Sequence, residues 1–169
     1  MSRFDKQTLL LTPHDHGQCI EDALERADEL CRKSGVKLTE LRRQVLELVW
    51  HSHKPLGAYD ILALLSDQSG KKAAPPTVYR ALDFLQEQGL VHRISSLNAF
   101  IGCPMPEHQH RSYFLICRNC AIAMEINSST LAKELNLFAQ QAGFTVENET
   151  VEVVGLCPNC QAEQSNVPD

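Results

Sequence analysis

Apolar residues recur at the three- and four-residue spacing of an amphipathic helix through the first half of the chain. The first stripe covers residues 20–31 and stops at Gly35, and Thr39 is suited to cap the next helix. Two prolines precede the last stripe, which starts after Thr77 and stops at Gly89. The pattern predicts helices within residues 19–34, 40–54, 58–65 and 77–88, with a polar loop at 66–74.

The spacing of apolar positions changes after the fourth helix. Two short runs, Leu90–Ile94 and Ala99–Gly102, flank the polar turn Ser95–Asn98 and predict a β-hairpin. Helices followed by a hairpin are typical of a helix-turn-helix domain with a wing, which is a DNA-binding architecture. The first half is therefore predicted to be a winged-helix domain over residues 18–103, preceded by a flexible tail at 1–17.

A second domain is predicted beyond Pro104 and Pro106, which lie in a hinge at residues 104–107. Continuous and alternating apolar runs after the hinge predict strands, and a helical stripe closed by Gly143 separates them. The predicted α/β domain spans residues 108–160, with strands at 113–117, 121–126 and 144–156, a helix at 131–142, and a disordered tail at 161–169.

Charge is distributed unevenly along the chain. The net charge of −5 by itself disfavours a nucleic-acid partner, but residues 31–94 contain ten Lys or Arg and six Asp or Glu, a local net of +4. A local basic surface matters more for phosphate contact than the global sum.

No apolar run approaches the roughly 20 residues that a membrane span needs. We therefore expect a cytoplasmic protein with no membrane partner.

Four of the seven cysteines form two Cys-x-x-Cys pairs, Cys117 with Cys120 and Cys157 with Cys160. A two-residue turn brings both sulfurs of a pair to the same side, and four thiolates about 2.3 Å from one metal make a closed, structural zinc site. The alternative is a redox dithiol, which in thioredoxin-type proteins opens a helix. Because no helix is predicted at either second cysteine, the pattern favours zinc.

Polar side chains mark the fourth predicted helix as a candidate DNA-reading element. An arginine such as Arg80 can bind guanine O6 and N7 together, and Tyr79 can contact a thymine methyl group or a phosphate. Thr77 and the helix N-terminus can hold a phosphate. The alternative is a solvated helix face with one amphipathic tyrosine, and the residues alone leave both interpretations open.

The run Pro-Pro-Thr-Val-Tyr-Arg-Ala-Leu at residues 75–82 closely resembles the recognition-helix motif of the ferric uptake regulator superfamily. Leu38-Thr39 followed by Arg42-Arg43 resembles the start of that family's second helix, and the two cysteine pairs sit where the family has its structural zinc. The segments 58–60 and 81–85 resemble the zinc uptake regulator branch, and the whole resemblance covers residues 18–160.

The resemblance implies an α+β fold, with an N-terminal winged-helix DNA-binding domain and a C-terminal α/β dimerisation domain. It also implies a homodimer without enzymatic activity, whose zinc-loaded form binds a palindromic DNA operator and represses zinc-uptake genes. Two Zn²⁺ per chain are implied, one structural and one regulatory. By position, the regulatory ligands are His92, Cys103, His110 and Glu125, and His108 is the alternative to His110. This donor set suits tetrahedral zinc better than octahedral iron or manganese.

Further candidates and alternatives remain. Arg42, Lys71, Lys72 and Arg93 are candidate phosphate contacts. The chain could instead sense another metal or peroxide, although residues 111–114 lack the His-His-Asp-His run of iron-type members. It could also hold structural zinc only, or act as a thiol redox sensor. A zinc-dependent nucleobase deaminase is disfavoured, because no histidine here begins a His-x-Glu motif.

Overall fold

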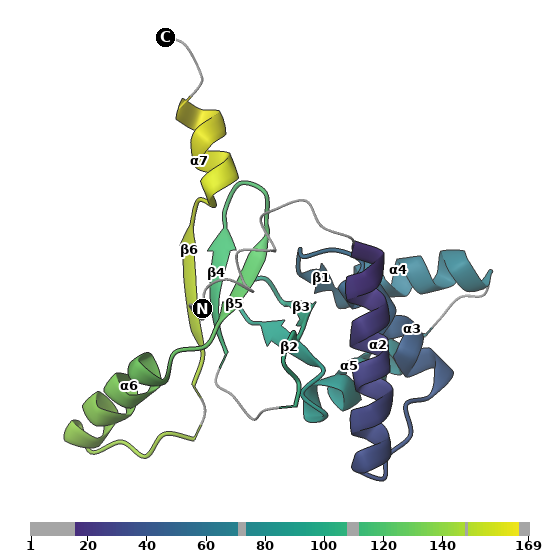
Figure 1. The fold of residues 1–169 in the computed structure, drawn as a ribbon, viewed down its shortest axis with the longest axis horizontal. Coiled ribbons are helices and arrows are strands. Elements are labelled where there is room, and N and C mark those ends of the chain that lie inside the picture. Colours follow the sequence, from purple (N-terminus) through teal and green to yellow (C-terminus); the bar gives the residue numbers. More distant parts are fainter. Residues whose placement is uncertain (1–15, 71–73, 108–111, 148, 166–169) are drawn as a thin grey trace.

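The structure, a computed structural model, describes residues 16–70, 74–107, 112–147 and 149–165. Four helices lie together on one side of the molecule, at the right of Figure 1. All four were predicted from the apolar stripes, and the prediction is confirmed. Their bounds are α2 (His16–Lys33), α3 (Glu40–Trp50), α4 (Ala58–Ser69) and α5 (Pro75–Glu87).

A single apolar core joins the four helices. Each helix contributes at least one fully buried side chain to it, namely Ala27, Val45, Ile61, Leu82 and Leu85. Full burial of one such aliphatic side chain stabilises a fold by about 1.5–3 kcal/mol, which explains why the stripes predicted these elements well. Helix α5 begins at two prolines, whose missing N–H groups cost nothing in a first helical turn.

The wing is a three-stranded antiparallel sheet packed beside α3 and α5. Its strands are β1 (Leu56–Gly57), β2 (Val91–Ile94) and β3 (Ala99–Gly102), in the order β1-β3-β2. The hairpin β2–β3 was predicted and is confirmed, including its turn at residues 95–98. Strand β1 was not predicted, because two residues carry no periodicity and their partner Phe100 lies far along the chain.

The second half is built on a sheet with the order β5-β4-β6. Strands β4 and β5 form an antiparallel hairpin, whereas β6 pairs with β4 in parallel after the connecting helix α6. Figure 1 shows α6 standing away from the sheet, and none of its residues is buried. The bounds are β4 (Tyr113–Cys117), β5 (Ala123–Ile126), α6 (Ser129–Gln141), β6 (Val151–Gly155) and α7 (Pro158–Ser165).

The wing and the second sheet share a small apolar cluster. Ile94 and Ile101 of the wing pack with Phe114, Ile116 and Ala123 of β4 and β5. All five are buried, so the two halves of the chain meet across a packed interface. Among the described residues, none of the helices combines the length and apolar character needed to span a bilayer.

Several boundaries predicted in the first half are wrong, among them the start of α5 at Pro75 rather than at Thr77. Helix α2 begins at His16, inside the segment expected to be a tail. Helix α4 continues through residues 66–69, which were expected to be a loop, and within it the Ser66 hydroxyl donates a 2.8 Å hydrogen bond to the Leu62 carbonyl. Gly70, with φ near +64°, ends the helix instead.

Several boundaries predicted in the second half are also wrong, among them the starts of β5 at Ala123 and of α6 at Ser129 rather than at 121 and 131. Strand β6 covers only five of the residues expected to be extended, because β4 offers five partners. Phe144, also expected in the strand, instead closes the end of α6, where its backbone N–H donates to the Ala139 carbonyl. Helix α7 occupies residues 158–165, part of which was expected to be disordered, and it opens at the second cysteine pair. The expectation that no helix starts at these cysteines is therefore wrong.

Close packing at Gly102 predicts a stability effect. A Cβ atom added there would lie 2.3 Å from the indole of Trp50, so we expect Gly102→Ala to lower the free energy of unfolding by about 1–3 kcal/mol. Gly155→Ala is the matched control, because a Cβ atom at Gly155 meets nothing within 4 Å. Denaturant unfolding followed by the fluorescence of Trp50, the one tryptophan, measures both variants. Equal losses would contradict the packing argument.

Candidate metal centres and nucleic-acid interface

The four paired cysteines converge at one end of the second sheet. Cys117 ends β4 and Cys157 follows β6, and these parallel strands bring their carboxyl ends to the same edge. Cys120 lies in the turn after β4, and Cys160 lies in the first turn of α7. The four sulfurs all lie within 4.8 Å of one another, as a single metal ion requires.

Backbone amides prepare Cys117, one of the four cysteines, for the thiolate form, whereas burial and hydrogen bonds among the thiols raise the pKa of Cys120 and Cys160. The N–H groups of Cys120 and Cys157 lower the pKa of the Cys117 thiol to about 6, and the Cys157 amide donates to its sulfur at 3.4 Å. The Asn119 side chain donates to the Cys160 sulfur at 3.3 Å. The thiol of Cys117 is therefore largely ionised at neutral pH, and thiolate is the form that binds metal.

The distances fit zinc better than a disulfide. The sulfurs of Cys120 and Cys157, one from each pair, are 3.7 Å apart. Four Zn–S bonds of about 2.3 Å in a tetrahedron place sulfurs about 3.8 Å apart, whereas a disulfide needs about 2.05 Å. Although α7 does open at the second pair, the convergence of all four sulfurs distinguishes this site from a two-cysteine redox motif.

A second cluster joins the two halves of the chain. His92 lies on β2, Cys103 directly follows β3, and Glu125 lies on β5, so the wing supplies two of the side chains and the second sheet supplies the third. One ligand atom from each lies within 4.8 Å of the others. The His92 Nε2 is 3.4 Å from the Glu125 carboxylate.

The second cluster is buried, so the charged forms of its side chains are unfavourable unless an opposite charge lies beside them. Glu125 and Cys103 are 5% and 3% exposed. Burial, together with the nearby charge of Glu125, raises the pKa of the Cys103 thiol to about 12. A divalent cation reverses this balance, because it favours both the thiolate and the carboxylate. Sulfur, imidazole and carboxylate donors around one point suit zinc.

A serine also belongs to this cluster and was not predicted. The Ser112 hydroxyl donates to a Glu125 carboxylate oxygen at 2.5 Å and lies 3.2 Å from the His92 Nε2. In the sequence, the only sign that Ser112 belongs to this cluster is its position next to the histidines of the interdomain link. Of the proposed regulatory ligands, His110 lies outside the described residues, as does its alternative His108.

The candidate DNA-reading side chains lie on the outer face of α5. Thr77, Tyr79 and Arg80 are exposed, and Tyr79 keeps 39% of its surface exposed. The buried positions of the same helix pack into the core. Helix α5 therefore presents exposed hydrogen-bonding side chains of the types that can contact DNA.

The remaining candidate phosphate contacts differ in their surroundings. Arg42 lies 3.5 Å over the Phe84 ring and donates to the Lys37 carbonyl, so it links α3 to α5. Arg93 is exposed on the wing and donates to Asn98 at 2.7 Å. Lys71 and Lys72 lie outside the described residues.

The fold and these clusters define a winged-helix protein with two groups of side chains that could each bind a metal ion. Residues 33–154 match the model of the ferric uptake regulator family. The chain belongs to this family.

Comparison with individual proteins places zinc regulators among its relatives. The zinc uptake regulation protein of Escherichia coli K12 is 36% identical over 83% of this chain and 82% of its own length. A solved zinc uptake regulator in complex with zinc and DNA is 34% identical, covers 86% of this chain and 97% of its own, and aligns with a TM-score of 0.82.

One relative, XcZur, has been solved in two states. Its holo form is 39% identical and aligns with a TM-score of 0.75 over 82% of this chain and 96% of its own. Its apo form aligns with a TM-score of only 0.50, over 85% of this chain and 99% of its own. The arrangement of this chain is therefore closer to the holo form than to the apo form.

Loss of one paired cysteine tests the first cluster. We expect Cys120→Ser to lower the zinc content by about one ion per chain and to melt the second sheet, because structural zinc contributes folding free energy directly. Cys19→Ser is the control, since Cys19 lies on α2 away from the pairs. Zinc counting and thermal unfolding measure the effect, and unchanged melting with one zinc fewer would refute it.

Proposed function

We propose that this chain is a zinc-responsive transcriptional repressor. It acts as a homodimer whose zinc-loaded form binds a palindromic operator and represses zinc-uptake genes, and it is not an enzyme. Two zinc ions bind per chain, a structural one at Cys117, Cys120, Cys157 and Cys160 and a regulatory one at His92, Cys103, His110 and Glu125. The observation that carries the proposal is that the second cluster draws its donors from both halves of the chain.

The regulatory mechanism follows from the position of that cluster. When bound, zinc supplies the positive charge that lets a thiolate, a carboxylate and imidazoles share one buried site. His92 and Cys103 then hold the wing against Glu125 of the second sheet. Because the wing is packed on α5, this fixes the direction in which the recognition helix points. The closer likeness to a holo than to an apo relative supports this view.

The hinge at residues 104–107 has a further support from α2. The Arg26 guanidinium donates to the Pro104 carbonyl at 3.0 Å, directly after the Cys103 ligand position. A second bond from Arg26 to the Asp22 carbonyl holds the side chain in place. The helix bundle thus restrains the backbone that leads from the wing into the second domain.

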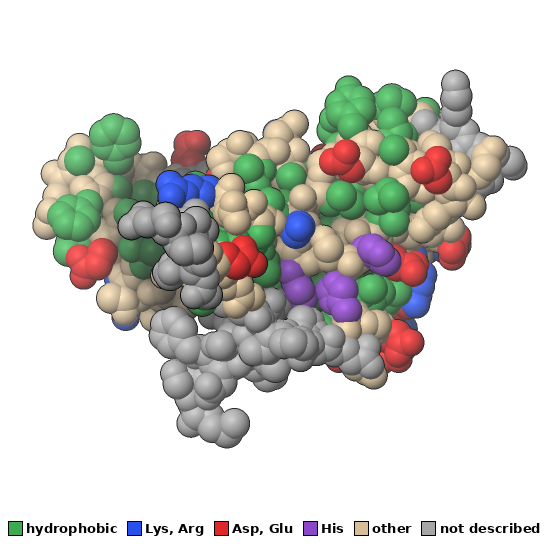
Figure 2. Space-filling model, turned by 90° about the horizontal axis from the view of Figure 1, so that it is seen from above, with side chains coloured by type: hydrophobic (Ala, Val, Ile, Leu, Met, Phe, Trp, Pro, Cys, Tyr) green, Lys and Arg blue, Asp and Glu red, His purple; other side chains and the backbone are tan. Residues whose placement is uncertain are grey.

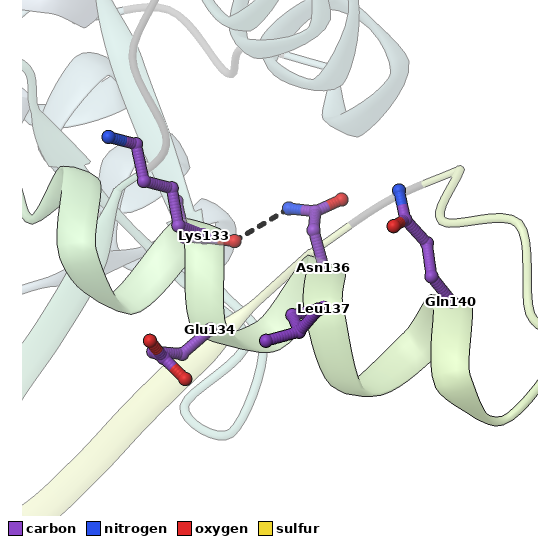
Figure 3. A pocket seen from close by; sticks show the side chains of 6 residues that line it. Lys133, Glu134, Asn136, Leu137 and Gln140 are labelled. Carbon is purple, nitrogen blue, oxygen red and sulfur yellow. Dashed lines mark hydrogen bonds between the residues drawn. The ribbon is translucent and has the colours of Figure 1, made fainter.

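An exposed apolar surface in the second half supports a homodimer. Val153 on β6 and Phe138 on α6 are 51% and 64% exposed. Figure 2 shows apolar side chains gathered at the left end of the molecule, where α6 lies. In Figure 3, Leu137 projects from α6 between Glu134 and Gln140 beside an open hollow along the helix. A second copy of the chain is the expected occupant, since exposed apolar patches of this kind mark interfaces.

Zinc-dependent DNA binding tests the proposed function. We expect Cys103→Ser and His92→Ala to weaken operator binding by about 5- to 150-fold at a buffered zinc level that saturates the wild type. Cys19→Ser is the control, because Cys19 is outside both clusters. A gel-shift titration at several free zinc levels measures the effect. Wild-type affinity that does not change when only the structural zinc remains would overturn the proposal.

The recognition helix makes a separate prediction. Arg80→Ala should cost about 1–3 kcal/mol of binding and relax the preference at one base pair, because an arginine can read a guanine edge. Arg93→Ala on the wing should instead weaken all sequences alike and reduce the salt slope by about one. Binding to a selected operator and to a scrambled duplex at several salt concentrations separates the two. Identical behaviour of both variants would contradict the assignment.

A further inference from the structure

One row of side chains on the second sheet faces the wing. In the strand register, Phe114 of β4 is the direct partner of Glu125 on β5 and of Glu152 on β6. Directly opposed residues of neighbouring strands point to the same face of a sheet. Glu125, Phe114 and Glu152 therefore form one continuous row across all three strands.

Every member of this row contacts the wing hairpin. Glu125 meets the His92 ring at the beginning of β2, and the Phe114 ring lies 5.8 Å from the same imidazole, measured between ring centroids. Glu152 meets the other end of β2, where the hairpin turns. The row thus follows β2 from its first residues to the turn, a distance of about 10 Å.

The contact of Glu152 is specific in its geometry. Its two carboxylate oxygens accept from two consecutive backbone amides, Ser95 at 2.7 Å and Ser96 at 3.1 Å. Burial alone would raise the pKa of Glu152, but the hydrogen bonds from Ser96 and Ser95 outweigh it and lower the pKa. At neutral pH the carboxylate is ionised, and hydrogen bonds to a charged acceptor are about twice as strong as neutral ones.

We propose that Glu152 is a positioning residue that clasps the wing turn to the second sheet, so that the wing has two polar anchors beside its apolar cluster, only one of which needs metal. This proposal rests on the proposed function, because its consequence is the orientation of the recognition helix. Apolar packing of Ile94 and Ile101 is not directional, whereas two polar contacts about 10 Å apart restrict how the hairpin can turn on the sheet. When Glu152 holds the wing turn, zinc bound at the His92 end of β2 can fix the orientation of α5.

The clasp uses both backbone and side-chain donors of the wing turn. The backbone N–H groups of residues 95 and 96 bind the two carboxylate oxygens, and the Ser96 side chain adds a hydrogen bond of its own to Glu152. The contact therefore depends on the carboxylate of Glu152 and, in part, on the serine at position 96.

The test compares Glu152→Ala and Glu152→Gln with Glu163→Gln in the zinc-loaded, full-length protein. Glu163→Gln is the control because it makes the same charge change at an exposed position of α7. Hydrogen exchange of the Ser95 and Ser96 amides, followed by NMR, reports the clasp directly. Operator affinity at saturating zinc and the number of zinc ions per chain are measured on the same samples.

We expect Glu152→Ala to speed exchange of both amides at least tenfold and to weaken operator binding about fivefold or more, with zinc content unchanged. Glu152→Gln, which keeps one acceptor oxygen, should give smaller changes in both, and it also serves if the alanine variant fails to fold. Unchanged exchange would overturn the clasp, and faster exchange with unchanged operator affinity would overturn its positioning role. If the wild type shows no zinc-dependent DNA binding, the proposed function fails, whereas the exchange result still decides whether the clasp exists.

Discussion

A carboxylate buried between the two halves of the chain is the constraint on which the arrangement depends. Glu125 is 5% exposed, and an ionised carboxylate at such a site is strongly unfavourable unless charged or hydrogen-bonding partners compensate it. Its partners come mainly from elsewhere in the chain, the imidazole of His92 and the hydroxyl of Ser112. The proposed regulatory zinc adds the cation that such a cluster favours. Satisfying Glu125 therefore means bringing the wing onto the second sheet.

The wing transmits this constraint because it is part of the DNA-binding core. Leu90 and Val91 at the start of β2 lie in the same buried cluster as Leu85 of α5, only a few residues away. Densely packed cores deform little, so a change in the position of β2 is carried to the helix that precedes it. The exposed face of α5, with Tyr79 and Arg80, therefore follows the wing. The second cluster and the exposed face of α5 are therefore connected directly through the packed core.

The second half needs additional support because it is small. Its sheet has three strands, and α6 contributes no buried residue, so its own apolar core is limited. The structural zinc proposed for the cysteine cluster would tie the carboxyl ends of β4 and β6 together, and a second copy of the chain would cover Val153 and Phe138. The proposed metal and partner would thus supply what a single small domain lacks, and they would leave the opposite face of the sheet to the wing.

The sequence by itself determined the helices α2 to α6, the hairpin and both cysteine pairs, because periodicity and local spacing are properties of neighbouring residues. The motif at residues 75–82 also indicated the family and, through it, His92, Cys103 and Glu125. Only the tertiary structure decided that α7 opens at Pro158, that β1 pairs with β3, and that Ser112 and Glu152 face the wing. These features depend on strand register and on contacts between residues distant in the chain, which local patterns do not encode.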